Sequence, residues 1–129
     1  MTEYDNTSMG NQHLEIIGGN ILEGSVGISG AKNAVLKLMT ASLLVNNRSI
    51  IRNVPKIRDV EIMIGVIRGL GVDADWEDES TVVIKNTGHL GYAAPDELVR
   101  EMRASAQVMG PLLTKVGRVK LFQPGGDVI

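Results

Sequence analysis

The stretch VGISGAKNA, residues 26–34, decides the fold of this chain. Alternating apolar residues over 26–28 predict a strand, which breaks at Ser29-Gly30 and leads into a helix that begins at Ala31. The first backbone amides of a helix have no intrahelical acceptors, and the positive end of the helix dipole lies there. A strand, a turn and a helix N-terminus in this order indicate an anion-binding site.

Lys32 and Asn33 lie in the first turn of this predicted helix. A lysine at a helix N-terminus is repelled by the dipole, and a bound anion would offset that repulsion. The two residues are therefore candidate ligands of a phosphate or a carboxylate. A solvated lysine on an ordinary first turn is the alternative, and the residues alone leave both interpretations open.

The composition excludes several classes of protein. The chain has 129 residues, of which 43% are hydrophobic, enough for one globular domain with a buried core. A net charge of −2 with one Trp, two Tyr and one Phe argues against a nucleic-acid binder. The lack of cysteine excludes disulfides, thiolate zinc sites and cysteine nucleophiles, and His13 and His89 form no metal-ligand pattern.

The start and the end of the sequence allow further predictions. The polar residues 1–12 predict a flexible tail rather than a signal peptide, and no apolar run reaches the length of a membrane span. We therefore expect a cytoplasmic protein that does not bind membranes. The sequence stops at Ile129 in a glycine loop directly after a predicted strand, which is typical of a fragment.

The rest of the chain predicts an α/β (α+β) fold. Strands are expected over 13–17, 21–28, 49–53 and 118–122, with a hairpin of strands 72–76 and 81–85. Helices are expected over 31–45, 60–70 and 95–117. Asp59 is expected to be the N-cap of the second helix, Gly71 its C-terminal glycine, and Pro111 a kink in the third.

Arg103 and Asp127 are two further candidates for function. Arg103 lies beside the apolar stripe of helix 95–117, where its guanidinium could hold a phosphate or a carboxylate by two parallel hydrogen bonds. Asp127 follows two glycines, so that a loop could close over a ligand and the carboxyl group could donate a proton. A solvated arginine and a plain Gly-Gly-Asp turn are the alternatives.

Six ordered motifs resemble the N-terminal part of the UDP-N-acetylglucosamine enolpyruvyl transferases (UDP-N-acetylglucosamine 1-carboxyvinyltransferases), and the similarity runs from Leu14 to Ile129. They are SGAKNA (29–34), RNVPKIRDV (52–60), LGV (70–72), MRAS (102–105), GPLL (110–113) and PGGD (124–127). The resemblance implies that residues 13–129 are the N-terminal portion of such an enzyme, about one repeat unit and the start of a second.

The resemblance also implies a fold and an activity. The fold is part of an inside-out α/β barrel lobe built from β-α-β-α-β-β repeats. The reaction transfers the enolpyruvyl group of phosphoenolpyruvate to the 3′-hydroxyl of UDP-N-acetylglucosamine and releases phosphate. It is the first committed step of peptidoglycan synthesis, and it uses no metal and no organic cofactor.

By the same resemblance, Lys32 and Asn33 bind phosphoenolpyruvate, and Lys32 neutralises its phosphate and carboxylate. Arg103 is similar to the arginine that binds UDP-N-acetylglucosamine. Asp127 is similar to the proton donor, at a position where most members carry the cysteine that fosfomycin alkylates. The family's general base lies in later sequence, so the chain alone is expected to bind ligands weakly and to catalyse nothing.

The sequence departs from the family at Gln107, where an aromatic or aliphatic residue is common, and at Lys37, where proline is common. Both departures concern local packing. A shikimate-pathway enolpyruvyl transferase is a less favoured alternative, because SGAKN differs from that family's serine-lysine-serine start. A non-catalytic α/β module that binds a protein partner is the other alternative. In either case a missing lobe or self-association is expected to cover exposed apolar core.

Overall fold

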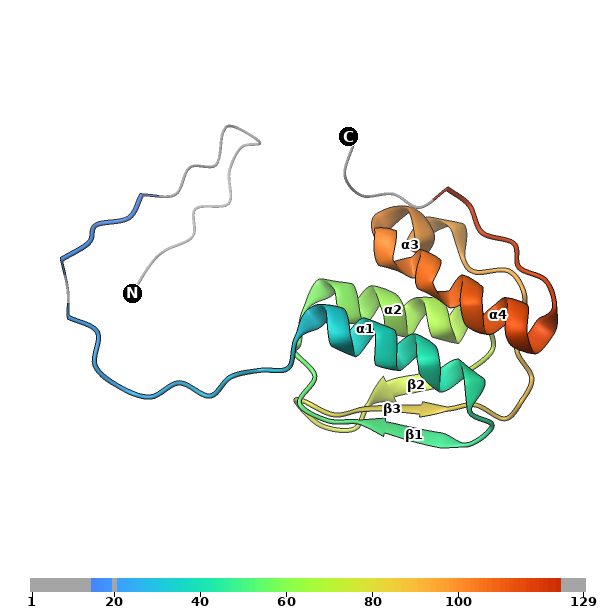
Figure 1. Ribbon diagram of the computed structural model, residues 1–129, viewed down its shortest axis with the longest axis horizontal. Coiled ribbons are helices and arrows are strands. Elements are labelled where there is room, and N and C mark those ends of the chain that lie inside the picture. Colours follow the sequence, from blue (N-terminus) through green and yellow to red (C-terminus); the bar gives the residue numbers. More distant parts are fainter. Residues whose placement is uncertain (1–14, 20, 124–129) are drawn as a thin grey trace.

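A three-stranded antiparallel sheet forms one layer of the computed structural model, which describes residues 15–19 and 21–123, and helices cover one face of that sheet (Figure 1). The predicted flexible tail, residues 1–12, lies outside the described residues. In chain order the elements are α1 (Lys32–Ala41), η1 (Ser42–Leu44), β1 (Arg48–Ile51), α2 (Arg58–Gly69), β2 (Asp73–Trp76), β3 (Val82–Lys85), α3 (Asp96–Glu101), η2 (Arg103–Val108) and α4 (Met109–Val116).

The sheet has the strand order β1-β3-β2, so the predicted hairpin is confirmed and β1 is an edge strand. Ala74 and Ile84 are register partners and fully buried on the face that the helices cover. On the other face, Lys85 pairs with Asp73. Burial alternates along β2, as is typical of a half-solvated antiparallel sheet, whereas Val82, Val83 and Ile84 of the central strand β3 are all buried.

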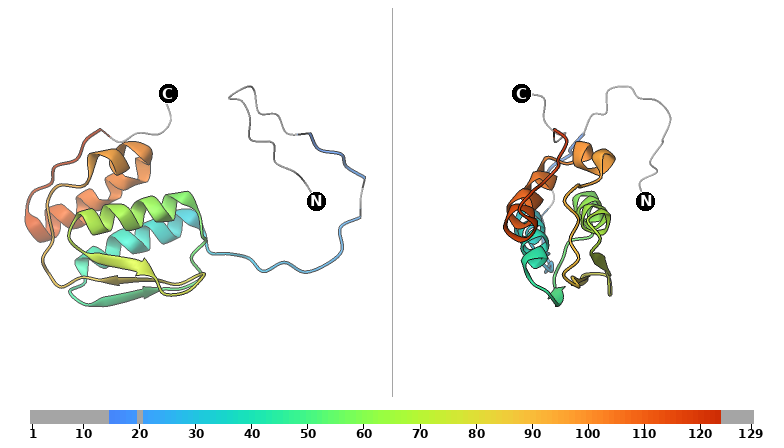
Figure 2. Two further views of the ribbon diagram at one scale, coloured as in Figure 1. Left: turned by 180° about the vertical axis from the view of Figure 1, so that it is seen from behind. Right: turned by 90° about the vertical axis from the view of Figure 1, so that its right-hand side faces the viewer.

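The helices α1 and α2 pack on each other. The apolar stripe expected from the sequence of α2, at Met63, Val66, Ile67 and Leu70, is buried and so confirmed. The stripe expected for α1 is confirmed only in part, because Ala34, Leu38 and Ala41 are exposed while Leu36 and Thr40 are buried. The views in Figure 2 show the strands together below the helices. Gly71 ends α2 as predicted, with φ 86°, and its amide N–H donates to Arg68 O while that of Val72 donates to Ile67 O. Asp59 is not the N-cap, because α2 begins at Arg58 after Ile57. It lies in the first turn instead.

The predicted helix over 95–117 is wrong as one continuous helix with a kink at Pro111. The chain leaves the helical conformation at Met102, with φ −144° and ψ 120°, which separates α3 from η2 and α4. Pro111 is the third residue of α4. It therefore lies in a first turn, where its missing N–H has no intrahelical acceptor to lose.

Two predicted strands near the start of the chain are absent from the described residues 15–19 and 21–28, which follow an extended course away from the layers (Figure 1). Their apolar side chains are exposed, Leu22 by 94% and Ile28 by 89%. A segment with apolar alternation forms a strand only where a neighbouring strand supplies hydrogen-bond partners for its backbone. No described segment pairs with these residues.

The predicted strand 118–122 is reduced to one parallel bridge between Lys120 and Ala93. The amide N–H of Lys120 donates to Tyr92 O at 2.7 Å, and that of Ala94 donates to Lys120 O at 3.3 Å. No described helix has the length and apolarity needed to cross a membrane.

Candidate functional site

The turns before α1 and before α2 are joined through their backbones. The amide N–H of Gly30 donates to the carbonyl oxygen of Asn53 at 3.0 Å, and Asn53 has a left-handed φ of 57°. A Cβ atom on residue 30 would lie 2.1 Å from that oxygen, so only glycine permits this approach. The motifs SGAKNA and RNVPKIRDV, which are separate in sequence, therefore form one local structure.

Lys32 and Asp59 form an ion pair beside this junction. The Lys32 Nζ atom lies 2.8 Å from Asp59 Oδ2, and the two side chains are 51% and 32% exposed. Lys32 is the first residue of α1 and Asp59 the second residue of α2. Both helices begin at the same end of the molecule, on the left in Figure 1, so the pair connects two helix N-termini.

The electrostatics of this place favour an anion. No described side chain caps α1 or α2 by a hydrogen bond. Both helix dipoles present their positive ends here, and the charge of the Lys32 ammonium is balanced by the Asp59 carboxylate that it contacts. Asn33 is exposed in the first turn of α1, so its amide is open to solvent. The arrangement can hold a phosphate or a carboxylate that arrives from solution.

Arg103 is not joined to these groups. It is exposed at the start of η2, an element that packs against α1. Within residues 15–19 and 21–123, no ion pair or hydrogen bond connects its side chain to Lys32 or Asn33. Asp127, the predicted proton donor, lies outside the described residues.

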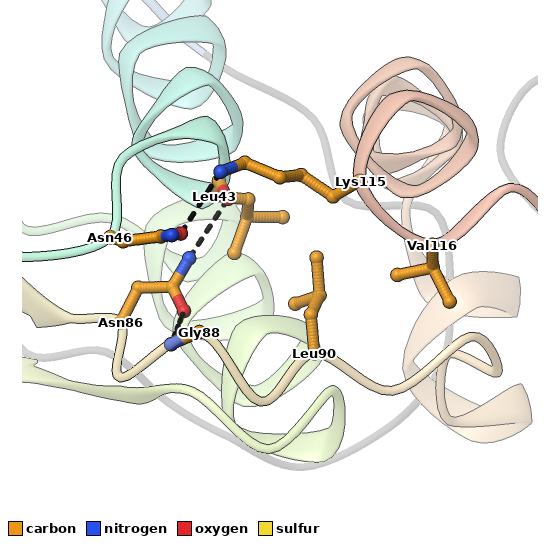
Figure 3. Close-up of a pocket in the computed structure, with 7 residues that line it drawn as sticks. All are labelled: Leu43, Asn46, Asn86, Gly88, Leu90, Lys115 and Val116. Carbon is orange, nitrogen blue, oxygen red and sulfur yellow. Dashed lines mark hydrogen bonds between the residues drawn. The ribbon is translucent and has the colours of Figure 1, made fainter.

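A cavity of about 440 Å³ lies at the opposite end of α1 (Figure 3). Its polar groups bond to one another: Asn86 Nδ2 donates to Leu43 O at 2.8 Å, and Lys115 Nζ donates to Asn46 Oδ1 at 2.9 Å. The Gly88 amide donates to Asn86 Oδ1. These contacts stabilise the loop after β3, and they leave no unpaired buried group that would point to a ligand.

In the part of the chain that the structure describes, no group of three or more His, Cys, Asp or Glu side chains is arranged to hold a metal ion.

Comparison with known families gives a match over most of the chain. Residues 16–129 match the family of EPSP synthase (3-phosphoshikimate 1-carboxyvinyltransferase). The chain belongs to this family. A solved structure, that of the enolpyruvyl transferase NikO from Streptomyces tendae, superimposes with a TM-score of 0.69 at 24% identity over 78% of this chain and 23% of its own. The predicted α/β fold of the enolpyruvyl transferases is thereby confirmed.

Curated relatives are more similar in sequence. The UDP-N-acetylglucosamine 1-carboxyvinyltransferase of Dichelobacter nodosus is 46% identical over 118 residues, which cover 92% of this chain and 28% of the relative. That of Rickettsia prowazekii is 48% identical over 121 residues, with 92% and 29% covered. The chain thus spans less than a third of the length of these relatives, and the resemblance stated from its motifs is confirmed.

In this member of the EPSP synthase family, Asp59 is a residue of the site that its sequence pattern does not reveal. The pattern predicts only a cap at Asp59, although the residue belongs to RNVPKIRDV, the motif that the structure places against SGAKNA. An acidic residue in a first turn suits either role, because each is favoured by the same helix dipole. Only the contact with Lys32 in the structure shows that Asp59 is an ion-pair partner rather than a helix cap.

Proposed function

We propose that this chain is part of an enzyme that transfers the enolpyruvyl group of phosphoenolpyruvate to the 3′-hydroxyl of UDP-N-acetylglucosamine and releases phosphate. Family membership supports carboxyvinyl transfer. The choice of acceptor rests on one observation, the identity of 43 to 48% to relatives named UDP-N-acetylglucosamine 1-carboxyvinyltransferase. Such an enzyme acts in peptidoglycan synthesis in the cytoplasm and requires no cofactor.

Lys32 and Asn33 are the proposed contacts of phosphoenolpyruvate. This substrate carries a phosphate and a carboxylate, and the start of α1 offers an ammonium, an exposed amide and helix amides without a side-chain cap. Lys32 supplies a full positive charge, which would stabilise the negative charge on the phosphate as it leaves phosphoenolpyruvate. Arg103 is the proposed contact of UDP-N-acetylglucosamine, and Asp127 the proposed proton donor.

Exposed apolar side chains support a larger assembly around this chain. Ile16, Leu22 and Val26 are exposed by 78%, 94% and 87%, and Leu38 of α1 by 55%. Near Leu38, β1 is an edge strand that pairs with β3 on one side and with no described strand on the other. We infer that another lobe, or a second copy, covers these surfaces, and that the 129-residue chain alone binds ligands weakly and releases no phosphate from its two substrates.

Ligand titrations of the 15N-labelled chain test this function. Phosphoenolpyruvate should shift the backbone amide signals of residues 31–34, and Lys32→Met should weaken its binding at least tenfold. Lys37→Met is the matched control, because Lys37 is an exposed lysine on the same helix. Unchanged binding in Lys32→Met would exclude the proposed phosphoenolpyruvate site.

The second substrate separates the remaining alternatives. UDP-N-acetylglucosamine is expected to shift signals near Arg103, whereas shikimate 3-phosphate is expected to have no effect. The family match is named for 3-phosphoshikimate, so the opposite result would assign this chain to shikimate metabolism. No effect of either compound, together with capture of a protein partner, would favour a non-catalytic module.

A further inference from the structure

We propose that Asp59 is a built-in counter-ion of Lys32, which competes with the anionic substrate for the lysine ammonium. The inference rests on the proposed function, which places a phosphate or carboxylate of the substrate at Lys32. It assigns Asp59 a role as a positioning residue that sets the affinity of this site for anions.

The geometry of the ion pair leaves room for exchange. Asp59 Oδ2 lies 2.8 Å from Lys32 Nζ, so the contact is a charge-assisted hydrogen bond. An ammonium has three N–H donors, of which this contact uses one. Half of the Lys32 side chain is exposed, and therefore a dissolved anion can approach the same nitrogen atom.

The two partners depend on the pair to different degrees. Asp59 lies in the first turn of α2, where the helix dipole stabilises a carboxylate even without a cation. Lys32 lies in the first turn of α1, where the dipole opposes its charge. An anion therefore stabilises the Lys32 ammonium, and Asp59 supplies one in this structure. The carboxylate remains well placed after the ammonium has turned to the substrate.

The other charged residues at the start of α2 are engaged elsewhere. Arg58 pairs with Glu101 of α3 at 2.6 Å, and Glu61 accepts a hydrogen bond from the Trp76 indole at 2.8 Å. Among the described residues, Asp59 is the carboxylate that contacts Lys32. Removal of its charge should therefore leave the ammonium available to a ligand.

Removal of the Asp59 charge should therefore increase the affinity of the site for anions. A negative charge a few ångströms from a bound anion weakens its binding, and this effect is moderate because the pair is half exposed. Asp59→Asn keeps the shape and removes the charge. We expect it to bind inorganic phosphate and phosphoenolpyruvate about three- to tenfold more tightly than the unsubstituted chain.

The experiment is an NMR titration of the full 129-residue chain with inorganic phosphate and with phosphoenolpyruvate. Asp59→Glu retains the charge and should restore nearly the original affinity. Glu79→Gln is the matched control, because Glu79 forms a comparable exposed pair with Lys56 at 2.9 Å. It should leave both affinities unchanged. Asp59→Ser, which also removes the charge and suits a helix start, replaces Asp59→Asn if that variant fails to fold.

A purely structural role of Asp59 predicts the opposite sign. Equal or weaker anion binding by a folded Asp59→Asn or Asp59→Ser chain would overturn the proposal, and so would equal tightening by Glu79→Gln. The Lys32→Met variant shows whether the role proposed for Asp59 alone is wrong or whether the proposed substrate site at Lys32 is wrong. If Lys32→Met binds phosphoenolpyruvate normally, or if no chain binds either anion, the substrate site at Lys32 is wrong and the competition is excluded with it.

Discussion

The ammonium of Lys32 lies 2.8 Å from the carboxylate of Asp59, and this contact joins the first turns of α1 and α2. A second contact, from the Gly30 amide to the Asn53 carbonyl, joins the turns that precede the two helices. Two sequence motifs with no evident relation thus form one site at paired helix N-termini. The proposed phosphoenolpyruvate site lies at this junction, where the positive ends of two helix dipoles meet.

Gly30→Ala should destabilise the chain by about 2 kcal/mol, because the new Cβ atom would lie 2.1 Å from Asn53 O and force the two turns apart. Urea denaturation measures the free energy of unfolding. Gly27→Ala is the control, since no atom lies within 4 Å of a Cβ atom there. Equal stability of both variants would mean that the junction does not hold the turns together.

Gln107→Leu should stabilise the chain by about 1 kcal/mol. Gln107 Oε1 is buried in η2 without a hydrogen-bond partner among the described residues, and a buried unpaired acceptor is costly. Leucine also returns this position to the aliphatic character that the resemblance suggests. The exposed Gln123 provides the control, because Gln123→Leu should change stability by less than about 0.5 kcal/mol. A loss of stability in Gln107→Leu would show that the amide has a partner in solution.

Arg103→Ala should weaken binding of UDP-N-acetylglucosamine about tenfold or more, since it removes charge-assisted hydrogen bonds to the ligand. Isothermal titration calorimetry or NMR gives the dissociation constant. Arg100→Ala tests whether any arginine nearby has this effect. Arg100 is exposed on α3, with its guanidinium carbon 5.8 Å from the Phe122 ring centre. Equal losses in both variants would argue for general charge attraction rather than a specific contact.

Fosfomycin should leave Asp127 unmodified in an active enzyme that contains this sequence. A protonated aspartic acid can donate a proton, but its carboxylate is a far weaker nucleophile towards an epoxide than a thiolate. Intact-mass measurement after incubation should show no adduct for the unsubstituted protein and one adduct for Asp127→Cys. A stable adduct at Asp127 itself would contradict the expected insensitivity.

The sequence alone predicted the elements whose signals are local. Apolar periodicity predicted α1, α2 and the hairpin of β2 and β3, and Gly71 marked the end of α2 because only glycine adopts its φ of 86° readily. The motifs around Lys32 and Arg103 also predicted the family that the comparisons confirmed. The predictions of helices, hairpin and helix end depend on residues close together in sequence, whereas the family inference depends on the order of six motifs over residues 29–127.

The features that depend on contacts between residues distant in sequence became clear only from the tertiary structure. Residues 21–28 have the alternation of a strand, yet no described segment pairs with them, and the helix expected over 95–117 is broken at Met102. Lys32 was predicted to face an anion, but packing of α1 on α2 was needed to show that Asp59 supplies one. Periodicity specifies which face of an element is apolar, whereas its partners are set by how the elements pack.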